Sequence, residues 1–404
     1  MSLRVFPWGR VILVSDPGHI AAVFASPHGR FHAGEGNRIL APVFGRHSLI
    51  TSDGDEHRRL RRLMAPMFGG AAVRGYRETV RAMTEHELRG WPERVPFRTM
   101  ERVRGLSFDI IWRILLGPDG GRRHDRLRTS LRRLPMTDVA VLMGLNHPCA
   151  RRLWPWRNTV RLLREIDALL YRTIRERRAA PDLRDRVDIL SRLITAGDAG
   201  DRLSDTEIRD QIVTLLFAGH ETTATTLAWA LHELARAPEA ARNAARAARS
   251  GDTGYLEAVV KETLRRRPPV FEATWTLTED VELDGYRLPR GATLMPLLGI
   301  VHMDPANYPA PGDFRPERFL GDAVPPHAFI PFGGGARRCI GAQLSMIESV
   351  EVLRVLLSRR GVTTDRPAPE AAVFKHVTLS PAGGARVLMT PAPGTIDHTP
   401  AEGS

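Results

Sequence analysis

The sequence contains very little cysteine and very little lysine. Its 404 residues include two cysteines, Cys149 and Cys339, and two lysines, Lys261 and Lys375. Two thiols cannot build a disulfide framework, so we expect a reducing, cytoplasmic compartment. The formal net charge of +12 is therefore carried by arginine. Because the arginines are spread along the chain, interleave with acids and form no recognisable binding module, the pattern speaks against nucleic-acid binding.

Long apolar runs are also missing. Runs such as "VILV" at Val11–Val14 fall far short of the roughly 20 residues that a membrane helix needs. The first residues, "MSLRVFPWGR", lack the apolar core of a signal peptide. We therefore expect no membrane span and no secretory leader. With 43% apolar and 26% charged residues, the composition is that of an ordinary globular protein.

Helical periodicity dominates from Pro17 to Arg267. Apolar residues recur at three- and four-residue spacing over Thr159–Arg178 and over Asp205–Ala237. Ser204 and Glu207 form a capping-box pattern at the start of the second segment. A helix of that length is long for a globular protein and predicts an element that crosses the whole molecule.

The β signals lie at the two ends of this helical region. "RVFPWGRVILVSD" predicts a hairpin, and "ATWTLTEDVELDGYRLPRGATLMPLL" predicts a small sheet with a turn at Asp284–Gly285. One further helix is expected over Gly341–Arg359. We predict one large, mainly α domain with a small β region over residues 1–390 and a disordered tail over residues 391–404.

The stretch "FIPFGGGARRCIGAQ" places Cys339 behind three glycines and two arginines, just before an apolar helical segment. A disulfide, a metal ligand, a nucleophile and an inert core thiol are all open for this cysteine. The amide N–H groups and the dipole at a helix start favour thiolate, which is the metal-binding form. No zinc-ligand spacing surrounds it. A porphyrin-bound iron, in contrast, needs only one protein ligand, and a lone thiolate on a glycine-rich loop suits that requirement.

The spacing of this loop resembles the haem-binding loop of the cytochrome P450 family. The pattern F-x-x-G-x-R-x-C-x-G is formed by Phe332, Gly335, Arg337, Cys339 and Gly341. The resemblance implies that these residues bind haem b and that Cys339 is the iron ligand.

Two further motifs extend the resemblance. Glu262 and Arg265 in "KETLRR" match the family's E-x-x-R pair, and Arg318 in "FRPERF" matches the arginine that completes a buried network with it. Residues at i and i+3 share a helix face, so the first two can form an ion pair. Removal of one member of such a network would leave an uncompensated buried charge.

The segment "AGHETT" lies in the middle of the long predicted helix. Gly219 weakens a helix, and consecutive threonines can bond back to preceding carbonyls and bend it. The resemblance implies a local opening over the iron at Ala218 and Gly219. It also makes Glu221 and Thr222 the acid–alcohol pair that supplies protons during dioxygen cleavage.

"DGDEHRRLRRLMAPMF" resembles the helix whose basic residues hold the haem carboxylates. His57 and Arg61 share a face there, and Arg337 in the cysteine loop is the third candidate. Nearby arginines are expected on the proximal surface, where they would attract an acidic ferredoxin or flavodoxin: Arg58, Arg59, Arg62 and Arg338.

The sequence departs from the family pattern at two places. The chain begins almost at the first strand, so the usual Pro-rich segment and first helix are missing from it. Many relatives also carry an arginine that contacts haem where this chain has Trp275, whose indole N–H could still donate a hydrogen bond. By analogy, Val270, Phe271 and Glu272 line the substrate pocket. Glu272 is unusual there and either meets a cationic group of the substrate or points into solvent.

The resemblance implies a monooxygenase that inserts one oxygen atom from O2 into a hydrophobic small molecule, by hydroxylation or epoxidation. Electrons would come from NAD(P)H through a ferredoxin or flavodoxin and a reductase. The arginine- and alanine-rich composition suggests bacterial secondary metabolism, and we expect a monomer. Two alternatives stay open: a haem-thiolate enzyme that catalyses rearrangement, ring closure or peroxide-driven oxidation, and a non-catalytic haem-binding protein.

Overall fold

The structure is a computed structural model of the chain. It describes residues 1–5, 9–26, 29–118, 120–134, 139–198, 200–321, 324, 327–375 and 377–391. The predicted tail lies outside these residues, except that Pro391 ends the last strand. Across the described residues, no helix combines the length and the apolar character that a membrane crossing requires.

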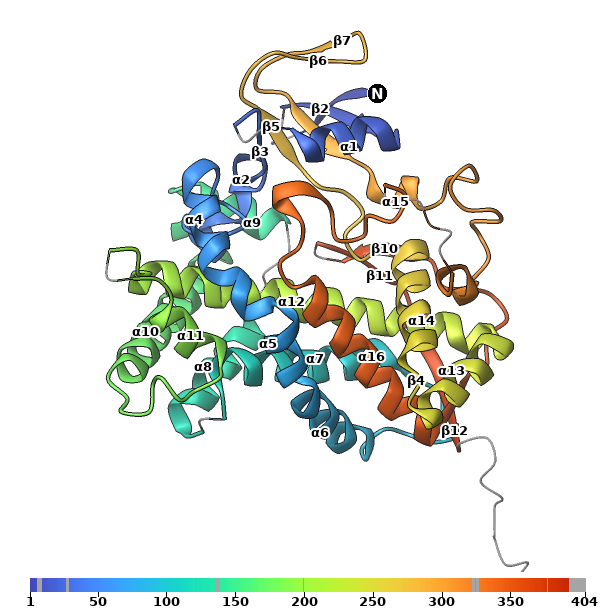
Figure 1. Cartoon of the computed structure of the whole chain (residues 1–404). Helices are drawn as coiled ribbons and strands as arrows, with labels where there is room; N and C mark the ends of the chain where they lie inside the picture. The colour runs from blue at the N-terminus through green and yellow to red at the C-terminus, as the bar shows by residue number, and fades with distance from the viewer. Residues whose placement is uncertain are drawn as a thin grey trace, which may run out of the picture.

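Helix α12, Asp205–Arg236, runs through the centre of the molecule (Figure 1). The predicted capping box is present, since the Ser204 side chain accepts from the Glu207 backbone and the Glu207 side chain bonds back. Helix α7, Thr99–Leu116, packs along α12. The prediction of a molecule-spanning helix is confirmed, with an end only one residue from the expected one.

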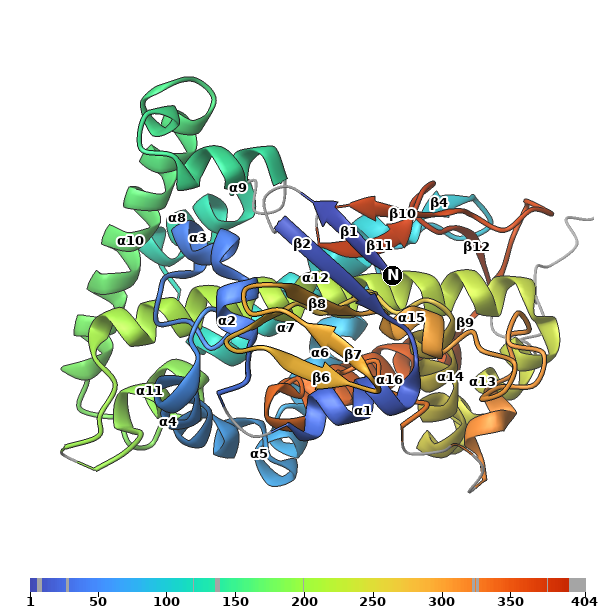
Figure 2. The same cartoon turned by 90° about the horizontal axis from the view of Figure 1, so that it is seen from above.

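The other helices surround this central element (Figure 2). The longest of them, α10, begins three residues before the predicted Thr159, and α16 begins one residue after the predicted Gly341. Their bounds are α1 Pro17–Ala25, α2 Ala33–Gly36, α3 Ala41–Phe44, α4 Gly54–Met64, α5 Gly70–Gly75, α6 Arg77–Leu88, α8 Arg122–Arg133, α9 Val139–Asn146, α10 Trp156–Arg178, α11 Ile189–Thr195, α13 Pro238–Ser250, α14 Thr253–Arg266, α15 Leu298–Val301 and α16 Ala342–Arg359.

A five-stranded sheet with the order β1-β2-β8-β5-β3 lies above the helices in Figure 1. The predicted N-terminal hairpin is its antiparallel pair β1–β2. The predicted turn at Asp284–Gly285 joins β6 and β7, and its φ angles of 50° and 75° fit a tight hairpin turn. The strands are β1 Ser2–Val5, β2 Gly9–Val14, β3 Phe31–His32, β4 Phe97–Arg98, β5 Trp275–Leu277, β6 Val281–Leu283, β7 Tyr286–Leu288, β8 Thr293–Pro296, β9 Arg360–Thr363, β10 Ala372–Lys375, β11 Thr378–Pro381 and β12 Arg386–Pro391.

Two hydrophobic clusters correspond to the two parts of the fold. The larger one joins the helices around α12. The smaller one lies between the five-stranded sheet and α1, and contains Ile20, Trp275 and Leu294. The sheet is thus attached to the helical body as a separate layer, and the segments that join the two layers are well placed to enclose a site.

A buried ionic network ties α14 to the irregular segment that follows α15. Arg265 donates from Nε to Glu262 Oε2 at 2.7 Å and from Nη2 to Oε1 at 2.9 Å, and both side chains are fully buried. Arg318 Nε donates to the same carboxylate at 3.1 Å. The remaining donors of Arg265 bond backbone carbonyls of His302 and Pro311. The structure thus brings the three motif residues together and fixes the long loop before the cysteine.

We predict that Glu262→Gln lowers the free energy of unfolding by about 3–5 kcal/mol, because it leaves two buried guanidinium groups without a counter-charge. Urea unfolding followed by circular dichroism measures this. The matched control is Glu279→Gln, which breaks the exposed ion pair with Arg30 and is expected to cost at most about 1 kcal/mol. Equal losses in the two variants would contradict a structural role for the network.

Candidate functional site

Helix α12 is buried along its length except at one turn. Between Ile208 and Ala235, only Ala218, Gly219, His220 and Thr222 are not buried, and Ala218 is exposed. An exposed alanine in the middle of a central helix indicates that this turn borders an internal space. The expected local opening of the helix is wrong, however, because α12 continues without interruption through this stretch.

Close packing between α7 and α12 accounts for a glycine at position 219. A Cβ atom at this position would lie 3.3 Å from Cγ1 of Ile111 on α7. The glycine thus lets α7 approach α12 closely just where α12 presents its accessible turn. Thr222 bonds back along the helix, with Oγ1 donating to the Ala218 carbonyl at 2.8 Å.

The cysteine loop lies next to this turn. Thr223 Oγ1 donates to Ser345 Oγ at 3.2 Å, and Ser345 belongs to the first turns of α16, which begins three residues after Cys339. Within the loop, the Cys339 N–H donates to the Phe332 carbonyl at 2.9 Å. Cys339 is solvent-accessible although protein surrounds it, as expected for a thiol on the wall of a cavity.

Glycines of this loop have the positive φ angles and the close approach of another group to the backbone that a glycine-rich loop allows. Gly333 and Gly335 have φ angles of +66° and +58°, which favour glycine. A Cβ at Gly335 would lie 2.0 Å from the Phe24 carbonyl oxygen of α1. Gly335 is therefore required by close packing against α1, which our sequence analysis did not foresee.

The thiol itself is not intrinsically acidic. Burial raises the pKa of Cys339, while the Gly341 N–H and the charges of Arg61 and Arg338 lower it. The expected thiolate-favouring effect of the helix start is thus outweighed by desolvation. A thiolate at this position needs a positive partner, which a bound metal would provide.

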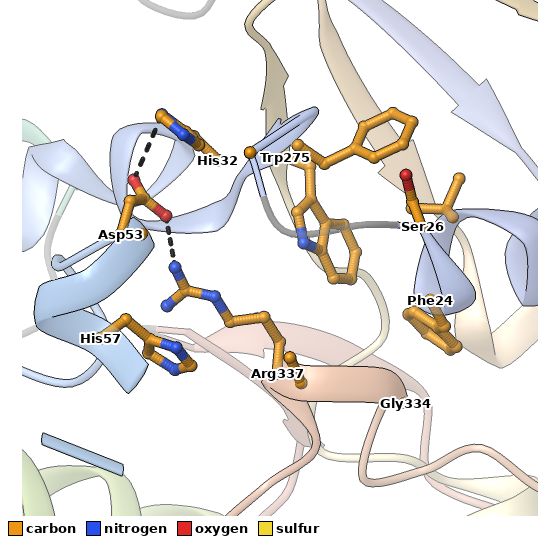
Figure 3. A pocket seen from close by; sticks show the side chains of 13 residues that line it. Phe24, Ser26, His32, Asp53, His57, Trp275, Gly334 and Arg337 are labelled. Carbon is orange, nitrogen blue, oxygen red and sulfur yellow. Dashed lines mark hydrogen bonds and ion pairs between the residues drawn. The ribbon is translucent and has the colours of Figure 1, made fainter. Parts of the chain in front are cut away.

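Cationic side chains gather beside the loop, on α4 and in the loop itself (Figure 3). His57 is buried and lines one cavity together with Arg337 and Trp275. Arg337 is paired with Asp53 and donates to the Ser52 carbonyl at 2.7 Å. Trp275 begins β5, and among the described residues no hydrogen bond is found for its indole N–H.

Arg61 is the cation nearest to the thiol that lacks a carboxylate partner within the described part of the chain. Burial lowers its pKa, and the pKa of Arg337 is lowered by burial and by Arg61. Asp53 offsets part of the charge of Arg337, and Arg61 adds a second guanidinium group beside it. The cluster therefore keeps an excess of positive charge that can receive the carboxylates of an anion.

The chain matches the family model described as Cytochrome P450 over residues 5–380. The chain belongs to the cytochrome P450 family. It is 37% identical over 393 residues to cytochrome P450 135A1 of Mycobacterium tuberculosis, covering 96% of this chain and 88% of that protein. It is 39% identical over 395 residues to cytochrome P450 135B1 of Mycobacterium bovis, with coverages of 96% and 84%.

Solved P450 structures share the fold. A cyanobacterial CYP120A1 with bound retinoic acid superposes with a TM-score of 0.82 at 25% identity, covering 95% of this chain and 89% of that one. The heme domain of cytochrome P450DA gives a TM-score of 0.83 at 24% identity, with coverages of 97% and 89%. This P450 is therefore a haem-thiolate monooxygenase that uses haem b, O2 and electrons from a redox partner.

The residues of this P450 fit the cofactor. The accessible thiol, the accessible turn of α12 and the two guanidinium groups correspond to the ligand, the distal wall and the carboxylate partners that a haem requires. Arg61 and Arg337 would hold the carboxylates, with His57 beside them. Of the four arginines expected on the proximal surface, three have acidic neighbours in the structure, and Arg338 is exposed.

The acid of the "AGHETT" motif is bound to a residue that the sequence analysis missed. Arg104 on α7 donates from Nε and Nη2 to the two oxygens of Glu221 at 2.9 and 2.8 Å. Glu221 thus points toward α7, while Thr222 lies on the accessible turn. The two side chains are adjacent in sequence but not in contact. Arg104 lies among other charged residues in "MERVRG", so no local signal in the sequence indicated this pairing.

A second buried acid was also missed. Glu348 on α16 is buried and accepts a hydrogen bond of 2.7 Å from Ser107 Oγ on α7. Burial raises its pKa to about 8, so the carboxyl is mostly protonated at neutral pH. The second cysteine, Cys149, is exposed.

We predict that Arg61→Ala and Arg337→Ala each release haem at least about tenfold faster than the wild type, because each removes a charge-assisted hydrogen bond of about 1.5–3 kcal/mol. Transfer of haem to an excess of apomyoglobin measures the rate. Arg338→Ala is the matched control, since it removes the exposed neighbouring arginine. If the control loses haem as fast as Arg337→Ala, the carboxylate-binding assignment is wrong.

Proposed function

We propose that this P450 inserts one oxygen atom of O2 into a C–H or C=C bond of a hydrophobic small molecule, with Cys339 as the haem ligand. The observation that carries the proposal is the location of the accessible Cys339 thiol beside the accessible turn of α12, bridged by the Thr223–Ser345 hydrogen bond. The exposed Cys149 has no comparable surroundings.

When bound, the haem supplies the redox chemistry by which O2, two electrons and two protons give one water and one oxygen atom transferred to the substrate. The chain's own residues have separate tasks. Cys339 donates a thiolate. Arg61 and Arg337 orient the cofactor through its carboxylates. Thr222 presents a hydroxyl on the accessible turn. Glu221 is the nearby acid that can return a proton to this hydroxyl after it has donated its own.

The electrons would come from NAD(P)H through an acidic ferredoxin or flavodoxin and its reductase. The exposed Arg338 lies in the cysteine loop next to Cys339, where it could attract such an acidic partner. We infer that the enzyme acts as a monomer. We also infer a role in bacterial secondary metabolism, which the arginine- and alanine-rich composition supports.

We predict that the reduced protein under carbon monoxide gives the difference spectrum of thiolate-ligated haem, and that Cys339→Ser abolishes it because the only thiolate at the iron is removed. Cys149→Ser is the matched control and keeps the spectrum. Persistence of the thiolate band in Cys339→Ser would refute the ligand assignment.

We predict that Thr222→Ala uncouples oxygen consumption from product formation, lowering the product formed per O2 about tenfold or more, because one positioned proton donor is lost. Oxygen uptake and product are measured together. Thr225→Ala removes the same atoms from a buried position of α12 and is expected to stay coupled. Unchanged coupling in Thr222→Ala would favour a peroxide-driven or rearrangement reaction.

A further inference from the structure

One acidic side chain in the segment between α14 and β5 has no role in the site described above. This segment, Val270–Thr274, begins over the central helix. The Leu379 N–H donates to the Pro269 carbonyl at 2.9 Å, and Trp229 Nε1 on α12 donates to the Leu379 carbonyl at 2.8 Å. Trp229 lies seven residues, about 10 Å along the helix, beyond Thr222.

The segment is followed by Trp275, which lines the same cavity as His57 and Arg337 (Figure 3). The chain thus runs from a point above α12 to the side chains of His57 and Arg337 beside the cysteine loop. Any molecule held between the accessible turn of α12 and the sheet layer has this segment as part of its wall.

The packing of alternate residues shows which way Glu272 points. Phe271 fits against α15, where a Cβ on Gly299 would lie 2.3 Å from its ring. Ala273 packs against the sheet cluster that also contains Trp275. Glu272 makes an extended bridge with Leu297, and in extended chain successive side chains point to opposite sides. Glu272 therefore points away from the sheet layer, on the side of the helical body.

The carboxylate of Glu272 has no counter-charge within the described part of the chain: no ion pair or side-chain hydrogen bond satisfies it there. Burial raises its pKa, and only its own backbone N–H favours the ionised form. Glu272 is nevertheless only half-buried, so protein does not enclose it completely.

Other buried acids of this protein are neutralised differently. Arginines pair with Glu221, Asp188 and Glu233, and Glu262 has two arginine partners. Glu348 also lacks an arginine partner, but it accepts a hydrogen bond from Ser107, whereas Glu272 has neither kind of side-chain partner among the described residues. An uncompensated, desolvated charge costs stability and is retained where a ligand supplies the opposite charge.

We propose that Glu272 recognises a positively charged nitrogen on an otherwise hydrophobic substrate. The inference rests on the proposed function, since it assigns a substrate class to the same site. Between apolar walls, the attraction of a carboxylate for a cation is stronger than in water, and the cation offsets the desolvation of the acid. Phe271 and Val270 add apolar surface, but the charge of Glu272 selects the substrate.

The test compares two ligands that differ in one atom type. The cation is 4-phenylbutyltrimethylammonium, which cannot ligate iron because its nitrogen has no lone pair. The neutral isostere carries a tert-butyl group in place of the trimethylammonium group. Titration calorimetry on the holoenzyme gives the ratio of the two dissociation constants. We expect the cation to bind about tenfold tighter to the wild type and the ratio to fall to about one in Glu272→Gln.

Two further variants separate charge from structure. Glu272→Asp keeps the charge and is expected to retain part of the preference. Glu282→Gln makes the same change at an exposed position of β6 and is expected to leave the ratio unchanged. The carbon monoxide spectrum of Glu272→Gln is expected to match that of the wild type, which shows that the variant is folded and loaded with haem.

The inference is overturned if the wild type shows no preference for the cation, including the case in which neither ligand binds. It is equally overturned if Glu272→Gln keeps the tenfold ratio. These outcomes differ from failure of the proposed function, which appears in the wild-type carbon monoxide spectrum and not in the binding ratio.

Discussion

The structure depends on one constraint: a single turn of the central helix must be both tightly packed and accessible. Helix α12 satisfies its own backbone hydrogen bonds and is buried almost everywhere, so an internal surface can arise only where its side chains are small. Gly219 lets α7 come close on one side, and Ala218 leaves surface free. The cysteine loop, joined to this helix through Thr223 and Ser345, then completes the opposite wall.

Arginine carries nearly all the positive charge, and the structure uses its planar fork in two distinct ways. In the Glu262 network, each donor of Arg265 finds an oxygen, and the buried charge is fully satisfied. Beside the cysteine loop, Arg61 and Arg337 are both desolvated and only Arg337 is paired with a carboxylate, that of Asp53, which leaves positive charge in excess. The first arrangement stabilises the fold. The arrangement of Arg61 and Arg337 lowers the stability of the protein until an anion binds. Such an arrangement is typical of a binding site.

The sequence was sufficient for the parts of the fold with local signals. The capping box at Ser204, the turn at Asp284–Gly285 and the spacing around Cys339 each depend on neighbours in the chain. The contacts that orient the site, in contrast, do not depend on neighbours in the chain. Arg104 lies 117 residues from Glu221, and Ser107 lies 241 residues from Glu348. Gly335 was read as a cofactor contact because nothing in the sequence shows that α1 presses on it.

The position of Glu221 shows how Glu221 and Thr222 of the "AGHETT" motif can act one after the other. Its carboxylate is held by Arg104, whose side chain is 36% exposed. The ion pair therefore runs from the surface of the molecule to a buried position on α12. Thr222, one residue on, faces the accessible turn with its hydroxyl donated to the Ala218 carbonyl. Under the proposed roles, a proton must therefore move in two stages. Glu221 would first leave Arg104 and take a proton from the solvent side. Its carboxyl would then turn and pass that proton to the Thr222 hydroxyl, while Thr222, released from its helix bond, donates its own proton inward. Because each stage breaks one local interaction, the resting enzyme holds its acid away from the reacting site.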